Sequence, residues 1–144
     1  RWTVVFFGFT QCPDVCPTTL TTLAQMKKKL ADLPAEQQPR VLLVTVDPER
    51  DTPAILKPYV TFFDPSFLGA TGTLAGTGQA ASAFSIPFAK VPLPGGGYTM
   101  DHGAGLFMVS PRGALAAYSS PPLDATVLAR DFRKVVQYFE ASHR

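Results

Sequence analysis

The sequence predicts an α/β fold with a mixed central sheet flanked by helices. Two buried strands near the amino terminus are each followed by a segment of helical periodicity, which is the pattern of a parallel β-α-β unit. Later in the chain two short apolar runs flank a turn sequence, and an amphipathic helix closes the chain. From the length of 144 residues we expect one domain over residues 1–144.

The first strand and the first helix follow from an apolar run and the residues that interrupt it. Trp2–Phe9 is apolar without regular polar alternation, so we expect a strand buried on both faces. Pro17 suits the first turn of the helix that follows. Apolar residues then recur at helical spacing at Leu20, Leu23, Met26 and Leu30. The run Lys27–Lys29 fits the carboxyl end of this helix, where cations are favoured.

The second strand and helix repeat this arrangement. Val41–Val46 predicts another buried strand, closed by a loop rich in proline and acidic residues. We expect Asp51 or Thr52 to cap the next helix, with Pro53 at its first position and apolar residues continuing to Phe63.

The middle of the chain predicts shorter elements. We expect a short strand over Phe67–Ala70, a helix of small residues over Leu74–Phe84, and a strand or hairpin arm over Phe88–Leu93. Prolines and three consecutive glycines follow, which predicts a mobile loop from Pro92 to His102.

The last third predicts a hairpin and a helix. Leu106–Val109 and Ala114–Tyr118 flank the turn sequence Ser110–Gly113. The final helix carries an apolar stripe of Val127, Leu128, Phe132, Val135, Val136 and Phe139. This order of elements is thioredoxin-like. The chain opens directly on the strand that should be central, which leaves no residues for an N-terminal hairpin or edge strand, and we expect it to begin inside a longer protein.

Composition excludes several classes of protein. Thirteen Lys and Arg against eleven Asp and Glu leave a net charge of +2, too small and too scattered for a nucleic-acid binder. Hydrophobic residues at 46% and charged residues at 17% exclude a disordered chain. No apolar run approaches the roughly 20 residues that a membrane-spanning helix needs.

The two cysteines, Cys12 and Cys16, lie together between the first strand and its helix. Free N–H groups and the positive end of the helix dipole stabilise a thiolate there. If the loop forms one helical turn, both sulfurs share a face and can reach one metal ion. Three interpretations remain open: a structural disulfide, thiol–disulfide exchange or peroxide reduction, and a metal site that needs further ligands.

His102 is the candidate third ligand, because it lies just before the Leu106 strand. In a thioredoxin-like sheet that strand lies beside the first one, so the segment before it faces the cysteine loop. Redox enzymes of this fold place a cis-proline there, whereas no proline occurs between Pro94 and Pro111. Two thiolates and an imidazole suit copper, and zinc could use the same groups with a water. The other histidine, His143, lies one residue from the end of the chain.

Three motifs resemble those of the Sco/SenC family of copper-delivery proteins. The first runs from Val4 to Thr19 and includes Cys-Pro-Asp-Val-Cys-Pro; the second is Val46–Pro53, Val-Asp-Pro-Glu-Arg-Asp-Thr-Pro. The third is Asp101-His102 ahead of an apolar strand, with Pro111-x-Gly113 after it. The motifs keep the family's order, and the resemblance covers essentially the whole chain.

The resemblance implies a copper metallochaperone, not an enzyme. It implies that Cys12, Cys16 and His102 bind Cu(I) or Cu(II), and that copper is delivered to the binuclear copper site of cytochrome c oxidase subunit II. It also implies an N-terminal membrane anchor, which these 144 residues lack. The Ala-, Pro- and Gly-rich composition favours the periplasmic face of a bacterial inner membrane over a mitochondrial inner membrane facing the intermembrane space.

The resemblance also covers an acidic pair, Asp47 and Asp51. We expect these residues to cap a helix and form turns around Pro48 and Pro53, with docking to a partner as the alternative.

The alternative function is a thiol–disulfide oxidoreductase or a peroxiredoxin-like enzyme acting through the same cysteines. Peroxiredoxins place Thr or Ser three residues before the reactive cysteine, and here Phe9 and Pro13 occupy those positions. Thiol exchange remains open, because two thiols so close together can cycle through a disulfide. Copper loading itself requires both thiols to be reduced. Other copper chaperones and thiol reductants are therefore further candidate partners.

Overall fold

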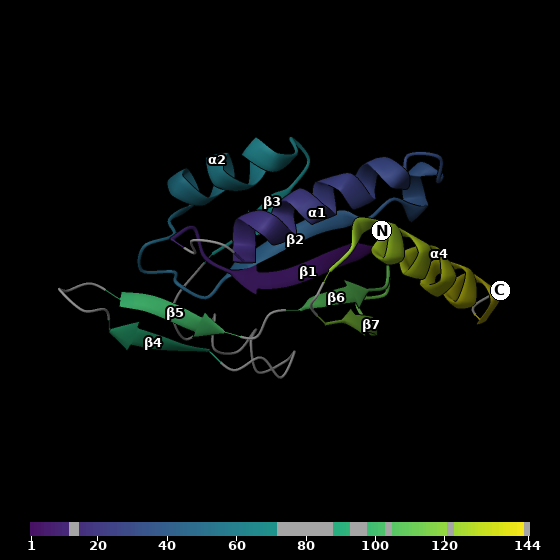
Figure 1. The fold of residues 1–144 in the computed structure, drawn as a ribbon. Coiled ribbons are helices and arrows are strands. Elements are labelled where there is room, and N and C mark those ends of the chain that lie inside the picture. Colours follow the sequence, from purple (N-terminus) through teal and green to yellow (C-terminus); the bar gives the residue numbers. More distant parts are fainter. Residues whose placement is uncertain (12–14, 72–87, 93–97, 103–104, 121–122, 143–144) are drawn as a thin grey trace.

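A five-stranded mixed sheet forms the centre of the molecule (Figure 1). The computed structural model describes residues 1–11, 15–71, 88–92, 98–102, 105–120 and 123–142, without the side chains of residues 15–16, 88–92, 98–102 and 142. The elements of the sheet and its helices are β1 (Thr3–Gly8), α1 (Val15–Lys29), a 3-10 turn η1 (Ala35–Gln37), β2 (Arg40–Thr45), α2 (Pro53–Phe63), β3 (Leu68–Ala70), β6 (Leu106–Val109), β7 (Leu115–Ser119) and α4 (Ala125–Ser142). A separate two-stranded sheet consists of β4 (Phe88–Pro92) and β5 (Tyr98–His102).

The sheet order is β3-β2-β1-β6-β7, with β1 at the centre. Val5 of β1 is paired with Leu42 of the parallel strand β2 and with Phe107 of the antiparallel strand β6. The parallel pair joined by α1 confirms the predicted β-α-β unit. The antiparallel β6–β7 hairpin confirms the second prediction, and Gly113 in its turn adopts φ of 81°.

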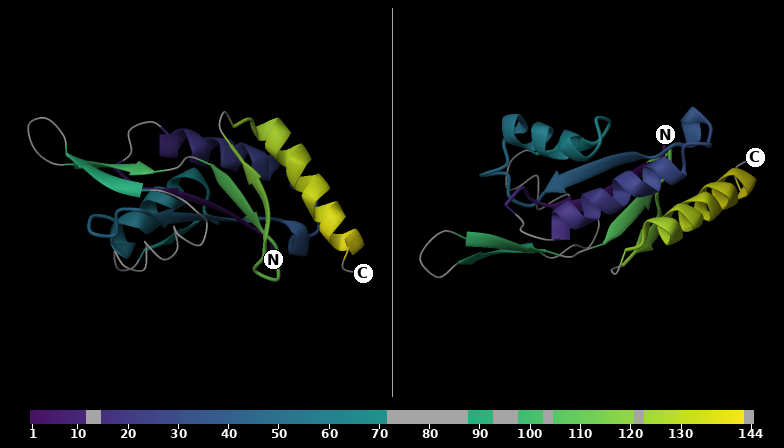
Figure 2. Two further views of the ribbon diagram at one scale, coloured as in Figure 1. Left: turned by 90° about the horizontal axis from the view of Figure 1, so that it is seen from below. Right: turned by 45° about the horizontal axis from the view of Figure 1, so that its top comes forward.

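The three helices α1, α2 and α4 pack on one face of the sheet and share one apolar core (Figures 1 and 2). Alternate residues of β1 enter that core, while the others join a second apolar cluster on the opposite face. The first set includes Val4 and Phe6, and the second includes Val5 and Phe7. Burial on both faces explains why the strand reads as a continuous apolar run, and it confirms that prediction.

The long helices are tied to the sheet and to each other at their ends. Trp2 is wholly buried, and its ring meets Phe132 and Phe139 of α4 edge-on at centroid distances of 5.9 and 5.1 Å. Arg133 of α4 donates hydrogen bonds to Asp32 and, at 2.9 Å, to the carbonyl of Lys29 at the end of α1. The bond from Arg133 also holds the pKa of Asp32 below its ordinary value.

One predicted loop is a strand. We expected a loop from Pro92 to His102, but Tyr98–His102 forms β5 and pairs with β4, with Phe88 opposite His102. The prolines and glycines therefore separate two strands and do not extend one long loop, because Tyr, Thr and Met at positions 98–100 suit a pleated backbone. The helix expected over Leu74–Phe84 lies outside the described residues. Among the residues that the structure describes, no helix is long and apolar enough to cross a membrane.

Gly69 in β3 provides a test of packing between the sheet and α2. A Cβ atom there would lie 2.5 Å from Leu56 Cγ, and Leu56 is almost wholly buried. We expect Gly69→Ala to lower the free energy of unfolding by about 2 kcal/mol, measured by urea denaturation. In a Leu56→Ala background the same substitution should cost little, because the added methyl group finds space. An equal loss in both backgrounds would contradict the overpacking argument.

Asp64, which follows α2, should make stability depend on pH. Burial raises its pKa, but hydrogen bonds from Ser66 and Lys27 outweigh that effect and hold the pKa below its ordinary value. Its contribution is therefore present above the unfolded pKa, near 4, and is lost as the pH falls through the lower folded value. We expect Asp64→Asn to cost about 1 kcal/mol near pH 7 and less near pH 3. Urea denaturation at the two pH values measures the difference, and a pH-independent cost would refute the assignment.

Candidate metal centre

The candidate ligands are carried by segments that meet at one end of the sheet. Cys16 lies in the first turn of α1, directly beyond the carboxyl end of β1, and His102 is the last residue of β5. Because β6 runs antiparallel to β1, the residues before Leu106 lie toward that same carboxyl end. Cys12 lies outside the described residues, as do the side chains of Cys16 and His102. The backbone thus places Cys16 and His102, the two candidate ligands within the described residues, toward the same end of the sheet.

Neighbouring carboxylates do not build a second metal site in the described part of the chain. No group of three or more His, Cys, Asp or Glu side chains gathers closely enough to hold a metal ion there.

Asp51 accepts hydrogen bonds that the sequence did not predict. Its side chain is wholly buried, and it accepts hydrogen bonds from the backbone N–H and the hydroxyl of Thr10, at 3.0 and 2.5 Å. The Thr45 hydroxyl donates a third bond, at 2.7 Å. The carboxylate therefore joins the segment before Cys12 to the end of β2.

Of the two residues predicted to cap α2, Asp51 or Thr52, the Thr52 alternative has the right position and the Asp51 alternative is wrong. Thr52 occupies the N-cap position without a side-chain cap bond, and Pro53 stands at the first helical turn as expected. Two threonine hydroxyls and an amide use the acceptor capacity of Asp51 instead. The sequence contains a signal for this bonding: Thr10 follows the first apolar run, and Thr45 lies near the end of the second. The loop after the second run then supplies Asp51 as an acceptor.

Asp47, the other member of the acidic pair, forms the turn as predicted. Its carbonyl accepts the N–H groups of Arg50 and Asp51 at 3.2 and 2.9 Å, and its carboxylate pairs with Arg50. Its side chain is only 2% exposed. With both carboxylates buried, the alternative of a docking surface formed by this pair is wrong.

Gly105 shapes the segment between His102 and β6. Gly105 is buried, and a Cβ atom there would lie 2.5 and 2.6 Å from Cε2 and Cζ of Tyr118 and still closer to its hydroxyl oxygen. The Tyr118 ring also contacts Phe107 at a centroid distance of 5.0 Å. Only a residue without a side chain fits under the ring in this position.

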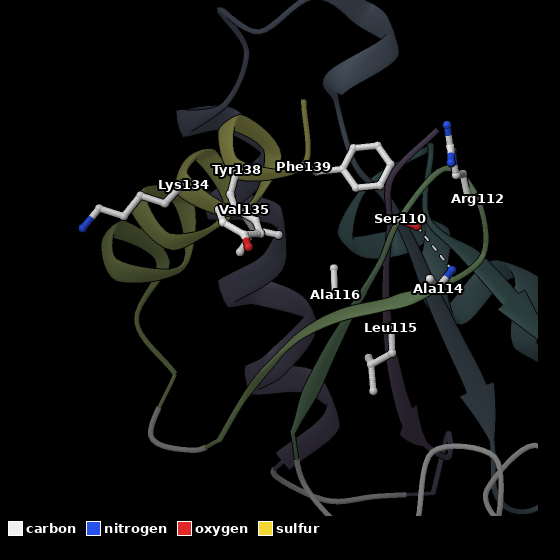
Figure 3. Close-up of a pocket in the computed structure, with 9 residues that line it drawn as sticks. All are labelled: Ser110, Arg112, Ala114, Leu115, Ala116, Lys134, Val135, Tyr138 and Phe139. Carbon is white, nitrogen blue, oxygen red and sulfur yellow. Dashed lines mark hydrogen bonds between the residues drawn. The ribbon is translucent and has the colours of Figure 1, made fainter. Parts of the chain in front are cut away.

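An apolar groove of about 420 Å³ lies at the other end of the sheet, between β7 and α4 (Figure 3). Leu115, Val135, Tyr138 and Phe139 line it, with Arg112 and Lys134 among its polar residues. Ser110, also in its lining, follows Val109, which pairs with Thr3 at the start of β1. The groove is therefore separated from the cysteine loop by the length of β1.

Comparison with known proteins identifies the family. The model of the SCO1/SenC family matches residues 1–137. The chain belongs to the SCO1/SenC family. A relative from Stutzerimonas stutzeri, named a putative copper-binding protein, is 39% identical over 132 residues, covering 90% of this chain and 63% of the relative. The mitochondrial SCO2 homologue of Bos taurus is 32% identical over 98% of this chain and 53% of its own length.

Structural comparison agrees with this assignment. The crystal structure of Arabidopsis thaliana ScoI with copper bound superimposes with a TM-score of 0.90 at 28% sequence identity, over 96% of this chain and 85% of that one. This likeness confirms the predicted thioredoxin-like fold. This SCO1/SenC chain spans between half and two thirds of the length of the two curated relatives above.

Gly105→Ala tests the packing of the segment that follows His102. The added methyl group should force the Tyr118 ring away from Phe107 and toward solvent, because Tyr118 is 53% exposed. We expect a loss of about 1 kcal/mol, the value of an aromatic pair, from urea denaturation. In a Tyr118→Ala background the same change should be nearly neutral. A full loss in that background would show that the strain lies in the backbone and not in the ring contact.

Proposed function

We propose that this SCO1/SenC protein is a copper metallochaperone and that Cys12, Cys16 and His102 hold the copper. The observation that carries the proposal is topological: in a chain of this family, the helix bearing Cys16 and the strand bearing His102 converge on the carboxyl end of the central strand. The copper-bound ScoI structure and the relative named as copper-binding support the choice of metal.

The donor set fits copper as a transported ion. Two thiolates are soft ligands that suffice for Cu(I), and an imidazole adds a donor that Cu(II) also accepts. Cys16 lies in the first turn of α1. The N–H groups of a first turn have no partner within the helix, and the helix dipole has its positive end there, so this position favours the thiolate form that a metal requires. The residues of this chain would thus bind and orient copper, without a chemical transformation of a substrate.

The proposed recipient is the binuclear copper site of cytochrome c oxidase subunit II, as the family resemblance implies. To transfer copper, the candidate metal centre has to reach an enzyme that lies in a membrane. We therefore propose that the protein is anchored on the periplasmic face of a bacterial inner membrane. Thiol reductants are proposed partners as well, because the cysteines bind copper only when reduced.

Copper titration of the reduced protein tests the ligand set. We expect one Cu(II) per chain and an intense thiolate-to-copper charge-transfer band. Cys12→Ser and Cys16→Ser should each change that band and weaken Cu(II) binding, because each removes one of the two thiolate donors. His102→Ala should weaken Cu(II) by about 100-fold or more, because losing a ligand exceeds the roughly 10–100-fold cost of losing an outer partner. Cu(I) should be weakened less, since two thiolates can hold it alone.

His143→Ala is the matched control, because it removes the only other histidine while leaving the proposed ligands in place. It should bind copper as the parent protein does. Retention of the parent spectrum and affinity in either cysteine variant would overturn the ligand assignment. A reduced protein that binds no copper but exchanges disulfides rapidly would favour the thiol–disulfide oxidoreductase.

A further inference from the structure

We propose that Asp51 is a positioning residue for the candidate metal centre: it anchors Thr10, and so fixes where the loop that carries Cys12 leaves the sheet. This inference rests on the proposed function, in which Cys12 and Cys16 act as a pair. It adds to that function a residue that is distant from both cysteines in the sequence.

The bonding of Asp51 is directed at the cysteine loop. Of the three hydrogen bonds that described residues donate to its carboxylate, two come from Thr10, one from the backbone and one from the hydroxyl. Thr10 stands two positions after Gly8, the last residue of β1, and two positions before Cys12. An anchor on both the backbone and the side chain of one residue fixes its position and its orientation together.

The anchor itself is rigid because it is buried and bonded on the other side. Thr45 at the end of β2 donates to the same carboxylate, and its hydroxyl accepts the N–H of Asp47 at 3.0 Å. The N–H of Asp51 donates to the carbonyl of Asp47 at 2.9 Å, which closes the turn. The Val46 N–H donates to the Gly8 carbonyl at 2.8 Å, so β1 and β2 remain paired up to this point.

The consequence for the candidate metal centre is that Cys12 can occupy fewer positions. Cys16 is fixed by the first turn of α1, whereas the loop that holds Cys12 begins at Thr10 and ends at Val15. Fixing the start of so short a loop raises the effective concentration of one thiol near the other. A chelating pair of thiolates and an intramolecular disulfide both depend on that concentration.

The test uses variants that differ at the Thr10–Asp51 contact. Asp51→Asn replaces one acceptor oxygen by an NH₂ group, which cannot accept from Thr10. Thr10→Val removes only the hydroxyl, and Thr10→Ser retains it. Gly69→Ala, on β3 and away from the cysteine loop, is the control for loss of stability without loss of the anchor.

Two readouts are measured for each variant beside the thermal unfolding midpoint. The first is Cu(II) affinity, from the charge-transfer band. The second needs no metal: in a glutathione buffer, the two thiols of Cys12 and Cys16 reduce one glutathione disulfide to two glutathione thiols and form one intramolecular disulfide. The equilibrium constant of that exchange reports how close the two sulfurs are held.

We expect Asp51→Asn and Thr10→Val to lower Cu(II) affinity by about 10-fold, in the range found for residues that orient metal ligands. The disulfide constant should fall severalfold in both. Thr10→Ser should restore both values, and Gly69→Ala should lower the unfolding midpoint while leaving both unchanged. If Asp51→Asn does not fold, Thr10→Val carries the test, since it keeps the backbone bond.

The outcomes separate this proposal from the function on which it rests. Unchanged copper affinity and disulfide constant in Thr10→Val and Asp51→Asn would overturn the positioning role while leaving copper binding in place. Losses of the same size in Gly69→Ala would also overturn it, because they would follow from stability alone. A parent protein without copper binding, but with a disulfide constant that falls in Asp51→Asn, would reject the proposed function and support the positioning of the dithiol.

Discussion

The burial of β1 on both faces is the constraint on which the rest of the structure depends. The strand lies between β2 and β6, and its alternate residues enter two different apolar clusters. A strand held in this way can neither slip in register nor tilt without exposing one of those clusters. Whatever follows its carboxyl end therefore starts from a fixed point, and the cysteine loop follows it directly.

The polar groups at that end make the fixed point useful. Backbone atoms at the end of a parallel strand leave the sheet and need new partners. Here Thr10 finds them in Asp51, which lies on the loop after the neighbouring strand. The apolar core fixes the position of β1. The buried carboxylate of Asp51 fixes Thr10 as well, at the start of the cysteine loop.

The parts of the fold that sequence reasoning predicted are those with a strong period and a long apolar run. The first two strands, their helices and the terminal helix have both, and their predicted and observed bounds differ by a few residues at most. The failure at Tyr98–His102 has a local cause: Pro92, Pro94 and three glycines dominate the segment. The pairing of β5 with β4 is decided by partner residues that lie six to fourteen positions away in the sequence. For the candidate site, residue types, motif spacing and the family resemblance nominated Cys12, Cys16 and His102, and their role as ligands stays a prediction. The role of Asp51 was not predictable, because capping a nearby helix and bonding to a distant threonine call for the same residue in the same loop.

If the chain carries copper as proposed, the arrangement would let it combine stability with release. The thiolate side of the proposed centre begins at β1 and α1, which belong to the main sheet and its largest core. The histidine side ends a hairpin that forms a separate two-stranded sheet and projects beyond the main one (Figure 1). A two-stranded hairpin has little stability of its own, since it lacks a third strand and a face of its own to bury. In the proposed function the thiolates would stay in place, while the imidazole, which would be the easiest ligand to withdraw, belongs to a two-stranded sheet that is separate from the main one.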